Sequence, residues 1–110
     1  MSVKRKIETE LLRLEKELKR YEDGVSWDSK FQYYTISGKI DILYDLISYK
    51  KFKRKEVYAL LLDVEEEYKK IRAVPKAERT TLQTIQGIYL EGKLDILKSW
   101  VMPMFSKPRT

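Results

Sequence analysis

The chain has 110 residues, of which 43% are hydrophobic and 36% charged, and its formal net charge is +6 at pH 7. A chain of this length supports one hydrophobic core, and its 4 Gly and 3 Pro residues are too few for a turn-rich β architecture. The sequence has no Cys and no His, which excludes a disulfide framework and removes the commonest general base and metal ligand. We therefore expect a cytoplasmic protein without a cofactor, and without a membrane span because no apolar run approaches roughly 18 residues.

The first two predicted helices cover residues 3–22 and 27–49. In the first, apolar side chains recur every three or four residues and form one stripe, which is typical of an amphipathic helix. Gly24 suits the left-handed position that ends such a helix, and Ser26 suits the N-cap of the next one. The second helix has apolar residues on two sides, so we expect it to be packed on both. Its two stripes are Ile36, Ile40, Leu43 and Ile47, and Phe31, Gly38, Ile42 and Tyr49.

A basic cluster, residues 50–55, follows the second helix. Five of its six residues are basic and one is aromatic: Lys50, Lys51, Phe52, Lys53, Arg54 and Lys55. A third amphipathic helix is predicted over 56–71. The fourth is predicted from about residue 77 or 81 to residue 102, where Pro103 should stop it. The remaining residues, 103–110, are expected to form a short tail.

A repeat relates the second helix to the fourth. Residues 31–47 match residues 85–101 at a constant offset of 54. The identical pairs are Gln32/Gln86, Gly38/Gly92, Lys39/Lys93, Asp41/Asp95, Ile42/Ile96 and Leu43/Leu97. Such a match, in phase with the apolar stripe, indicates internal duplication of a helical hairpin.

The repeat predicts an all-α fold for a single domain, residues 1–110. Four main helices should form two tandem hairpins related by a pseudo-two-fold axis, as in a helical bundle, with the first repeat at about 3–50 and the second at about 56–102. Gly38 and Gly92 lie in helix interiors, where glycine costs roughly 0.5–1 kcal/mol relative to alanine. Their presence in both copies predicts that the second and fourth helices cross closely at these residues, with the other two helices outside.

Asp41 and Asp95 are the strongest candidates for chemistry in the repeat. Two carboxylates brought together across a two-fold could share a proton or hold a divalent cation. Because no nucleophile or other ligand accompanies them, we favour the alternative that each carboxylate fixes helix packing. The sequence therefore predicts a protein that is not an enzyme.

The basic cluster 50–55 has the composition of a phosphate-contacting patch, with Phe52 available for stacking. An acidic protein surface or an anionic membrane would suit the same charges. The alternative is that these cations only stabilise the C-terminal end of the preceding helix. No zinc-finger spacing or Gly-rich phosphate loop supports a nucleic-acid site elsewhere in the chain.

Our interpretation is a small non-enzymatic protein-binding module, such as an adaptor, an inhibitor or an assembly component. The alternative is a small nucleic-acid-binding protein that uses the basic cluster, and a homodimer through the near-heptad stripe of the first helix is a further alternative. Surface tyrosines are the expected contact residues, namely Tyr33, Tyr34, Tyr44 and Tyr58. Short helical proteins with a Gly-centred apolar helix are common in phages and mobile elements, and this chain resembles that kind of protein, although the likeness transfers no residue roles.

Overall fold

The computed structural model describes residues 2–48 and 53–105. Within these ranges the chain is all-helical with four main helices and no strand, which confirms the predicted fold class. In the same ranges, no helix combines the length and the apolar character needed to cross a membrane. The elements in chain order are α1 (Val3–Lys19), α2 (Trp27–Ile47), α3 (Arg54–Ala73), the 3-10 turn η1 (Lys76–Glu78), α4 (Thr81–Ile96), the π-helical turn η2 (Leu97–Val101) and α5 (Met102–Phe105).

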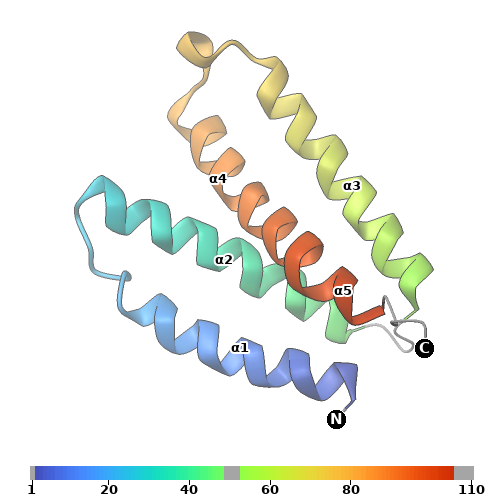
Figure 1. Cartoon of the computed structure of the whole chain (residues 1–110). Coiled ribbons are helices and arrows are strands. Elements are labelled where there is room, and N and C mark those ends of the chain that lie inside the picture. Colours follow the sequence, from blue (N-terminus) through green and yellow to red (C-terminus); the bar gives the residue numbers. More distant parts are fainter. Residues whose placement is uncertain (1, 49–52, 106–110) are drawn as a thin grey trace.

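The helices lie side by side in the order α1, α2, α4, α3 (Figure 1). Helix α2 packs most extensively against α4, while α1 packs on α2 and α3 packs on α4. The two hairpins diverge toward their connectors, residues 20–26 and 74–80, so that these two turns lie far apart (Figure 1). The inner helices α2 and α4 thus join the hairpins, and α1 and α3 lie outside, as predicted.

One hydrophobic cluster contains residues from all four main helices. On the inner helices, buried residues recur at the offset of 54: Ile36/Leu90, Ile40/Leu94, Ile42/Ile96 and Leu43/Leu97. On the outer helices they recur at an offset of 50: Ile7/Val57, Leu11/Leu61 and Leu14/Val64. The difference, 54 − 50 = 4 residues, is about one helical turn. The second hairpin therefore contains one more turn of chain than the first, between its outer and inner helices.

Side-chain caps begin α2 and α4. The Ser26 Oγ accepts a hydrogen bond from the Ser29 backbone N–H at 3.1 Å, as predicted. Thr80 and Gln83 form a reciprocal capping box at the start of α4. Gly24, by contrast, does not have the left-handed backbone that we predicted, since no described glycine has a positive φ. A Cβ at Gly24 would lie closer than 3.0 Å to the Cβ of Ser29, so the close approach of the chain to α2 requires glycine here.

Several predicted helix boundaries are wrong. Helix α1 ends at Lys19 and not at residue 22. Helix α3 begins at Arg54 and not at residue 56, so part of the basic cluster is helical. The fourth helix does not stop at Pro103, because helical structure continues to Phe105. Proline lacks a backbone N–H, and its ring would clash with a carbonyl one turn earlier in an α-helix. The π-helical turn Leu97–Val101 directly before it is wider and provides room for that ring.

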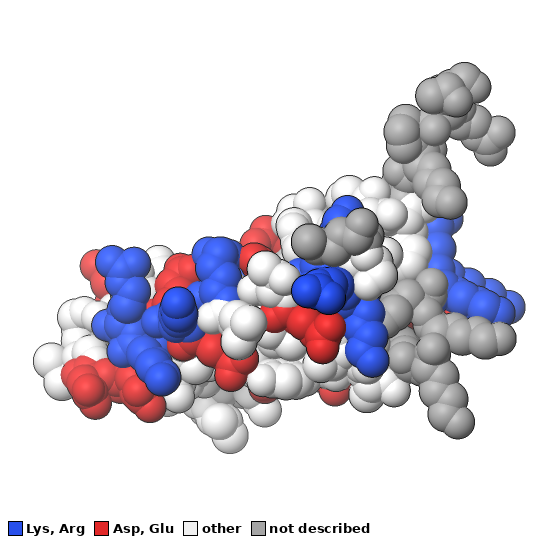
Figure 2. Space-filling model, turned by 90° about the horizontal axis from the view of Figure 1, so that it is seen from below, with Lys and Arg blue, Asp and Glu red and all other residues white. Residues whose placement is uncertain are grey.

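The face on which α1 lies carries mixed charges. Figure 2 shows that Lys and Arg side chains alternate there with Asp and Glu, so neither sign dominates. Arg13 illustrates the pairing: it lies 2.7 Å from Glu10 and 3.0 Å from Glu17, and these bonds raise the pKa of its guanidinium. Exposed pairs of this kind stabilise a helix by at most about 1 kcal/mol. We interpret this face as a solvated helix surface.

Candidate interaction surfaces

The two repeated glycines lie where α2 crosses α4. A Cβ at Gly38 would lie closer than 3.0 Å to the backbone carbonyl oxygen of Tyr89, and a Cβ at Gly92 would lie equally close to that of Thr35. Positions 35 and 89 are themselves 54 residues apart, so the two contacts are equivalent. Glycine at both positions allows the two backbones to approach one another, which fixes where the inner helices cross.

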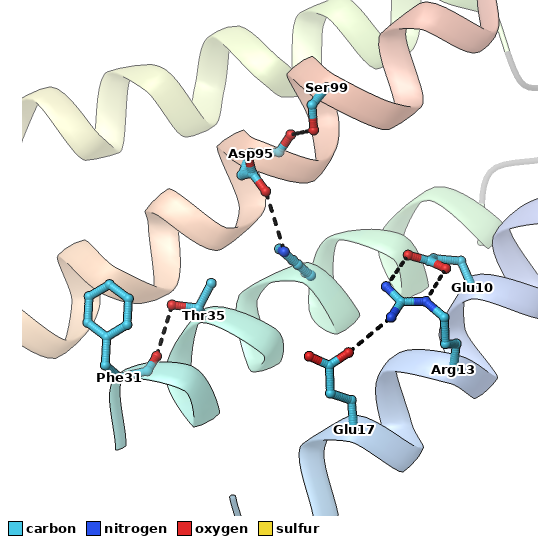
Figure 3. A network of polar contacts seen from close by, with 8 residues as sticks. Glu10, Arg13, Glu17, Phe31, Thr35, Asp95 and Ser99 are labelled. Atoms are coloured by element: carbon cyan, nitrogen blue, oxygen red, sulfur yellow. Dashed lines mark hydrogen bonds and ion pairs between the residues drawn. The ribbon is translucent and has the colours of Figure 1, made fainter. Parts of the chain in front are cut away.

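An ion pair joins α2 to α4 beside this crossing. The Nζ of Lys39 lies 3.4 Å from the Oδ2 of Asp95, and Figure 3 shows the carboxylate of Asp95 directed from α4 toward α2. The Asp95 side chain is 62% exposed, and exposed pairs contribute at most about 1 kcal/mol. The pair therefore adds little to stability at a crossing whose position the two glycines fix.

The equivalent residues Lys93 and Asp41 make different contacts, because Tyr89 lies between them. The Tyr89 hydroxyl donates a hydrogen bond to the Asp41 carboxylate, and the Nζ of Lys93 lies 4.6 Å from the centroid of the Tyr89 ring. The equivalent of Tyr89 is Thr35, whose hydroxyl instead donates to the carbonyl oxygen of Phe31 in its own helix at 2.9 Å (Figure 3). The exchange of Thr for Tyr therefore makes the two sides of the crossing chemically different.

Burial raises the pKa of Tyr89, and the hydrogen bond to Asp41 and nearby carboxylates raise it further. A tyrosine hydroxyl is ordinarily protonated near neutral pH, and here it serves as a donor to Asp41. Asp41 and Asp95 have separate partners, Tyr89 and Lys39, each on the opposite helix. In the ranges that the structure describes, no three His, Cys, Asp or Glu residues are grouped so that they could hold a metal ion. Both carboxylates thus act in joining α2 to α4.

The basic cluster is described in part, since Lys50, Lys51 and Phe52 lie outside the described residues. Lys53 is the N-cap residue of α3, and Arg54 and Lys55 occupy its first turn; all three are exposed. Our alternative interpretation, that the cluster stabilises the C-terminal end of α2, stays a prediction, although these three residues belong to the start of α3. They lie at the positive end of the α3 dipole, where a cation is unfavourable.

A groove of about 350 Å³ lies between the start of α2 and the second hairpin, and we call it the inter-hairpin groove. Helix α2 contributes Trp27 and Phe31, which are 53% and 39% exposed. The opposite side is lined by the apolar side chains of Ile71 in α3 and Ile88 in α4, and by Gly87, which has no side chain. The divergence of the hairpins creates this groove, because α2 is no longer covered by α4 near its N-terminal end.

The second hairpin supplies the polar wall of the inter-hairpin groove. The Tyr68 hydroxyl donates to the Glu91 carboxylate. The Arg72 guanidinium donates to the Tyr68 oxygen at 3.3 Å and lies 5.7 Å from the centroid of its ring. Burial and the bond to Glu91 raise the pKa of Tyr68, an effect that Arg72 partly offsets. Lys76 and Arg79 of the connector also line this wall.

Sequence reasoning missed Trp27 and Phe31, since it assigned Phe31 to a buried stripe of α2. Of the predicted surface tyrosines, Tyr44 and Tyr58 are exposed, whereas Tyr33 and Tyr34 are half-buried with their rings edge to face, 5.6 Å apart. The sequence does contain one indication of the groove, which is a difference between the two copies of the repeat. At the offset of 54, Trp27 corresponds to Thr81 and Phe31 to Ile85, so both aromatic residues belong to the first copy alone.

Comparisons of the chain with protein-family models, with curated proteins and with solved structures gave no match. The function is therefore inferred from the surface of this chain itself.

Proposed function

We propose that this chain is a small non-enzymatic protein-binding module and that the inter-hairpin groove holds its partner. The observation that supports this is the exposure of Trp27 and Phe31, large apolar side chains that line the groove. A few residues contribute most of the binding energy in protein interfaces, and Trp, Tyr and Arg are enriched among them. Trp27, Tyr68 and Arg72 bring all three types to this one groove.

The scaffold favours a preformed site. The walls of the groove are mainly helical, and helices position side chains better than loops do. The close contact of Gly38 and Gly92 with the opposite backbone holds α2 and α4 at the crossing. A partner would therefore meet a groove that needs little ordering, which reduces the entropy lost on binding. An adaptor, an inhibitor or an assembly component could each act in this way.

Photo-crosslinking tests the proposal. A photoreactive phenylalanine analogue at position 31 should give a discrete covalent adduct with one protein in cells of the source organism. The same analogue at position 58 is the control, because Tyr58 is 50% exposed on α3 and lies outside the groove. Trp27→Ala should abolish the adduct at position 31, whereas Tyr58→Ala should leave it unchanged. Equal adducts from both positions, or none from position 31, would contradict a partner in the groove.

A second candidate function is nucleic-acid binding through the basic cluster. Lys53, Arg54 and Lys55 are exposed at the N-terminal end of α3, where the helix dipole disfavours them. The dipole of α3 therefore does not account for these charges. A phosphate group would relieve their repulsion and would also suit the positive end of the helix dipole.

For this candidate we expect the chain to bind a nonspecific DNA duplex at low salt. The logarithm of the observed binding constant should fall linearly with the logarithm of the salt concentration, with a slope of about −0.9 for each phosphate that the protein neutralises. Replacing Lys53, Arg54 and Lys55 by Glu should abolish binding in a fluorescence-anisotropy titration. The matched control replaces Lys16, Lys19 and Arg20, at the C-terminal end of α1, by Glu as well. It therefore changes the net charge equally. No binding of the unaltered chain at low salt, or an equal loss in both variants, would rule out the cluster as the site.

A further inference from the structure

We infer that the inter-hairpin groove takes an acidic segment of the partner protein, in which an aromatic or aliphatic side chain lies next to the carboxylates. This inference rests on the proposed protein-binding function and specifies the chemistry of the partner. It is carried by the cations on one wall, by the apolar side chains opposite them and by the space at Gly87.

The charge of the groove favours a carboxylate. Three cations line it, Arg72, Lys76 and Arg79, against one carboxylate, Glu91. Glu91 already accepts a hydrogen bond from Tyr68, so part of its hydrogen-bonding capacity is used within the protein. An acidic segment would therefore gain favourable contacts with the cations.

Two of these cations are held in place. Arg79 donates from Nε to the carbonyl oxygen of Val74 at 3.0 Å and from Nη2 to that of Arg72 at 3.5 Å. These bonds satisfy carbonyl groups at the end of α3 and use two of the five guanidinium donors. Arg72 is oriented by its contacts with Tyr68. A planar guanidinium that is already oriented loses little entropy when it binds a carboxylate.

The apolar part of the groove favours a side chain as an anchor, and Gly87 leaves room for one. A Cβ at Gly87 would lie 3.5 Å from the Cγ2 of Ile71, an ordinary contact. Packing within the protein therefore does not require glycine at this position, although glycine destabilises a helix interior. The missing side chain keeps the groove open between Ile71 and Ile88, opposite Trp27 and Phe31.

A peptide fits this groove better than a nucleic-acid strand does. The phosphate backbone of a nucleic acid offers acceptors but no donors. A peptide backbone offers donors as well as acceptors. Arg72 and Lys76 can donate to such a segment, while Glu91 together with Gln83 and Thr84 of α4 can accept from it.

Fluorine NMR of the fluorotryptophan-labelled chain provides the test, because its two tryptophans report on different regions. Trp27 lies in the groove, and Trp100 lies in the π-helical turn and serves as the internal control. The probe is a short synthetic peptide in which Glu alternates with Leu. This peptide should shift the Trp27 resonance in a saturable manner and leave the Trp100 resonance in place. The same peptide with Lys in place of Glu should give no such shift.

The double variant Arg72→Glu with Lys76→Glu should weaken binding of the acidic peptide on the order of tenfold and should bind the Lys peptide instead. Lys16→Glu with Lys19→Glu, on α1, is the matched control and should change neither affinity. If the acidic peptide gives no saturable shift, or if the Lys peptide or oligothymidine binds the unaltered chain as tightly, the inference is wrong. The adduct at position 31 separates the two proposals: if it forms while the acidic peptide fails to bind, only the partner chemistry is wrong.

Discussion

Gly38→Ala and Gly92→Ala should each lower the free energy of unfolding by about 2–3 kcal/mol. Each new Cβ would lie closer than 3.0 Å to a backbone carbonyl oxygen of the opposite inner helix. A flexible side chain could move aside at small cost, but a backbone cannot move without displacing its whole helix. Urea denaturation followed by circular dichroism measures the loss, and we expect the two variants to be similar because their contacts are equivalent.

Gly87→Ala is the matched control for this prediction. It lies in α4 as Gly92 does, but its Cβ would make only an ordinary contact. This variant should gain about 0.5–1 kcal/mol from the better helix propensity of alanine. If alanine at position 38 or 92 is neutral or stabilising, as at position 87, then α2 and α4 do not cross as closely as described.

Leu43→Ala and Leu97→Ala should each lower the free energy of unfolding by about 2–5 kcal/mol. Both leucines are fully buried. They are equivalent at the offset of 54: Leu43 lies in α2, and Leu97 begins the π-helical turn that follows α4. Truncation removes the hydrophobic contribution of the side chain and leaves a cavity in the single core. The loss is measured as for the glycine variants.

Leu12→Ala and Leu62→Ala provide the control for the core prediction. These leucines are large and exposed, and they occupy equivalent positions of α1 and α3 at the offset of 50. Surface substitutions usually change stability by less than about 0.5 kcal/mol. A loss at position 12 or 62 that matches the loss at Leu43 would mean that the outer face of that helix is covered.

Much of the fold follows from the spacing of apolar residues. One stripe on each outer helix and two on α2 were enough to predict two hairpins with α2 and α4 inside, because a helix must bury each apolar face against another element. The two repeated glycines also predicted where α2 and α4 cross, because a glycine in a helix interior usually has a packing reason. These are local signals, and they are readable in a single sequence.

The inter-hairpin groove could not be predicted in the same way. It depends on how far the hairpins diverge, and the divergence results from the packing of all four helices together. The stripe containing Phe31 correctly indicated a second apolar face of α2, but it could not show that α4 leaves part of that face uncovered. The start of α3 was also missed, because its N-cap is Lys53, which makes no capping hydrogen bond from its side chain.

The four-residue difference between the two offsets also affects how many partners the chain can hold. In the second hairpin, nine residues separate Ile71 from Thr81, whereas five separate the corresponding Tyr21 and Trp27. The longer segment supplies Arg72, Lys76 and Arg79 to the inter-hairpin groove, and the first hairpin has no segment of that length. Two hairpins of equal length could offer a matching groove on each side. Because the lengthened hairpin provides this groove on one side of the molecule, we expect the proposed module to hold one partner there.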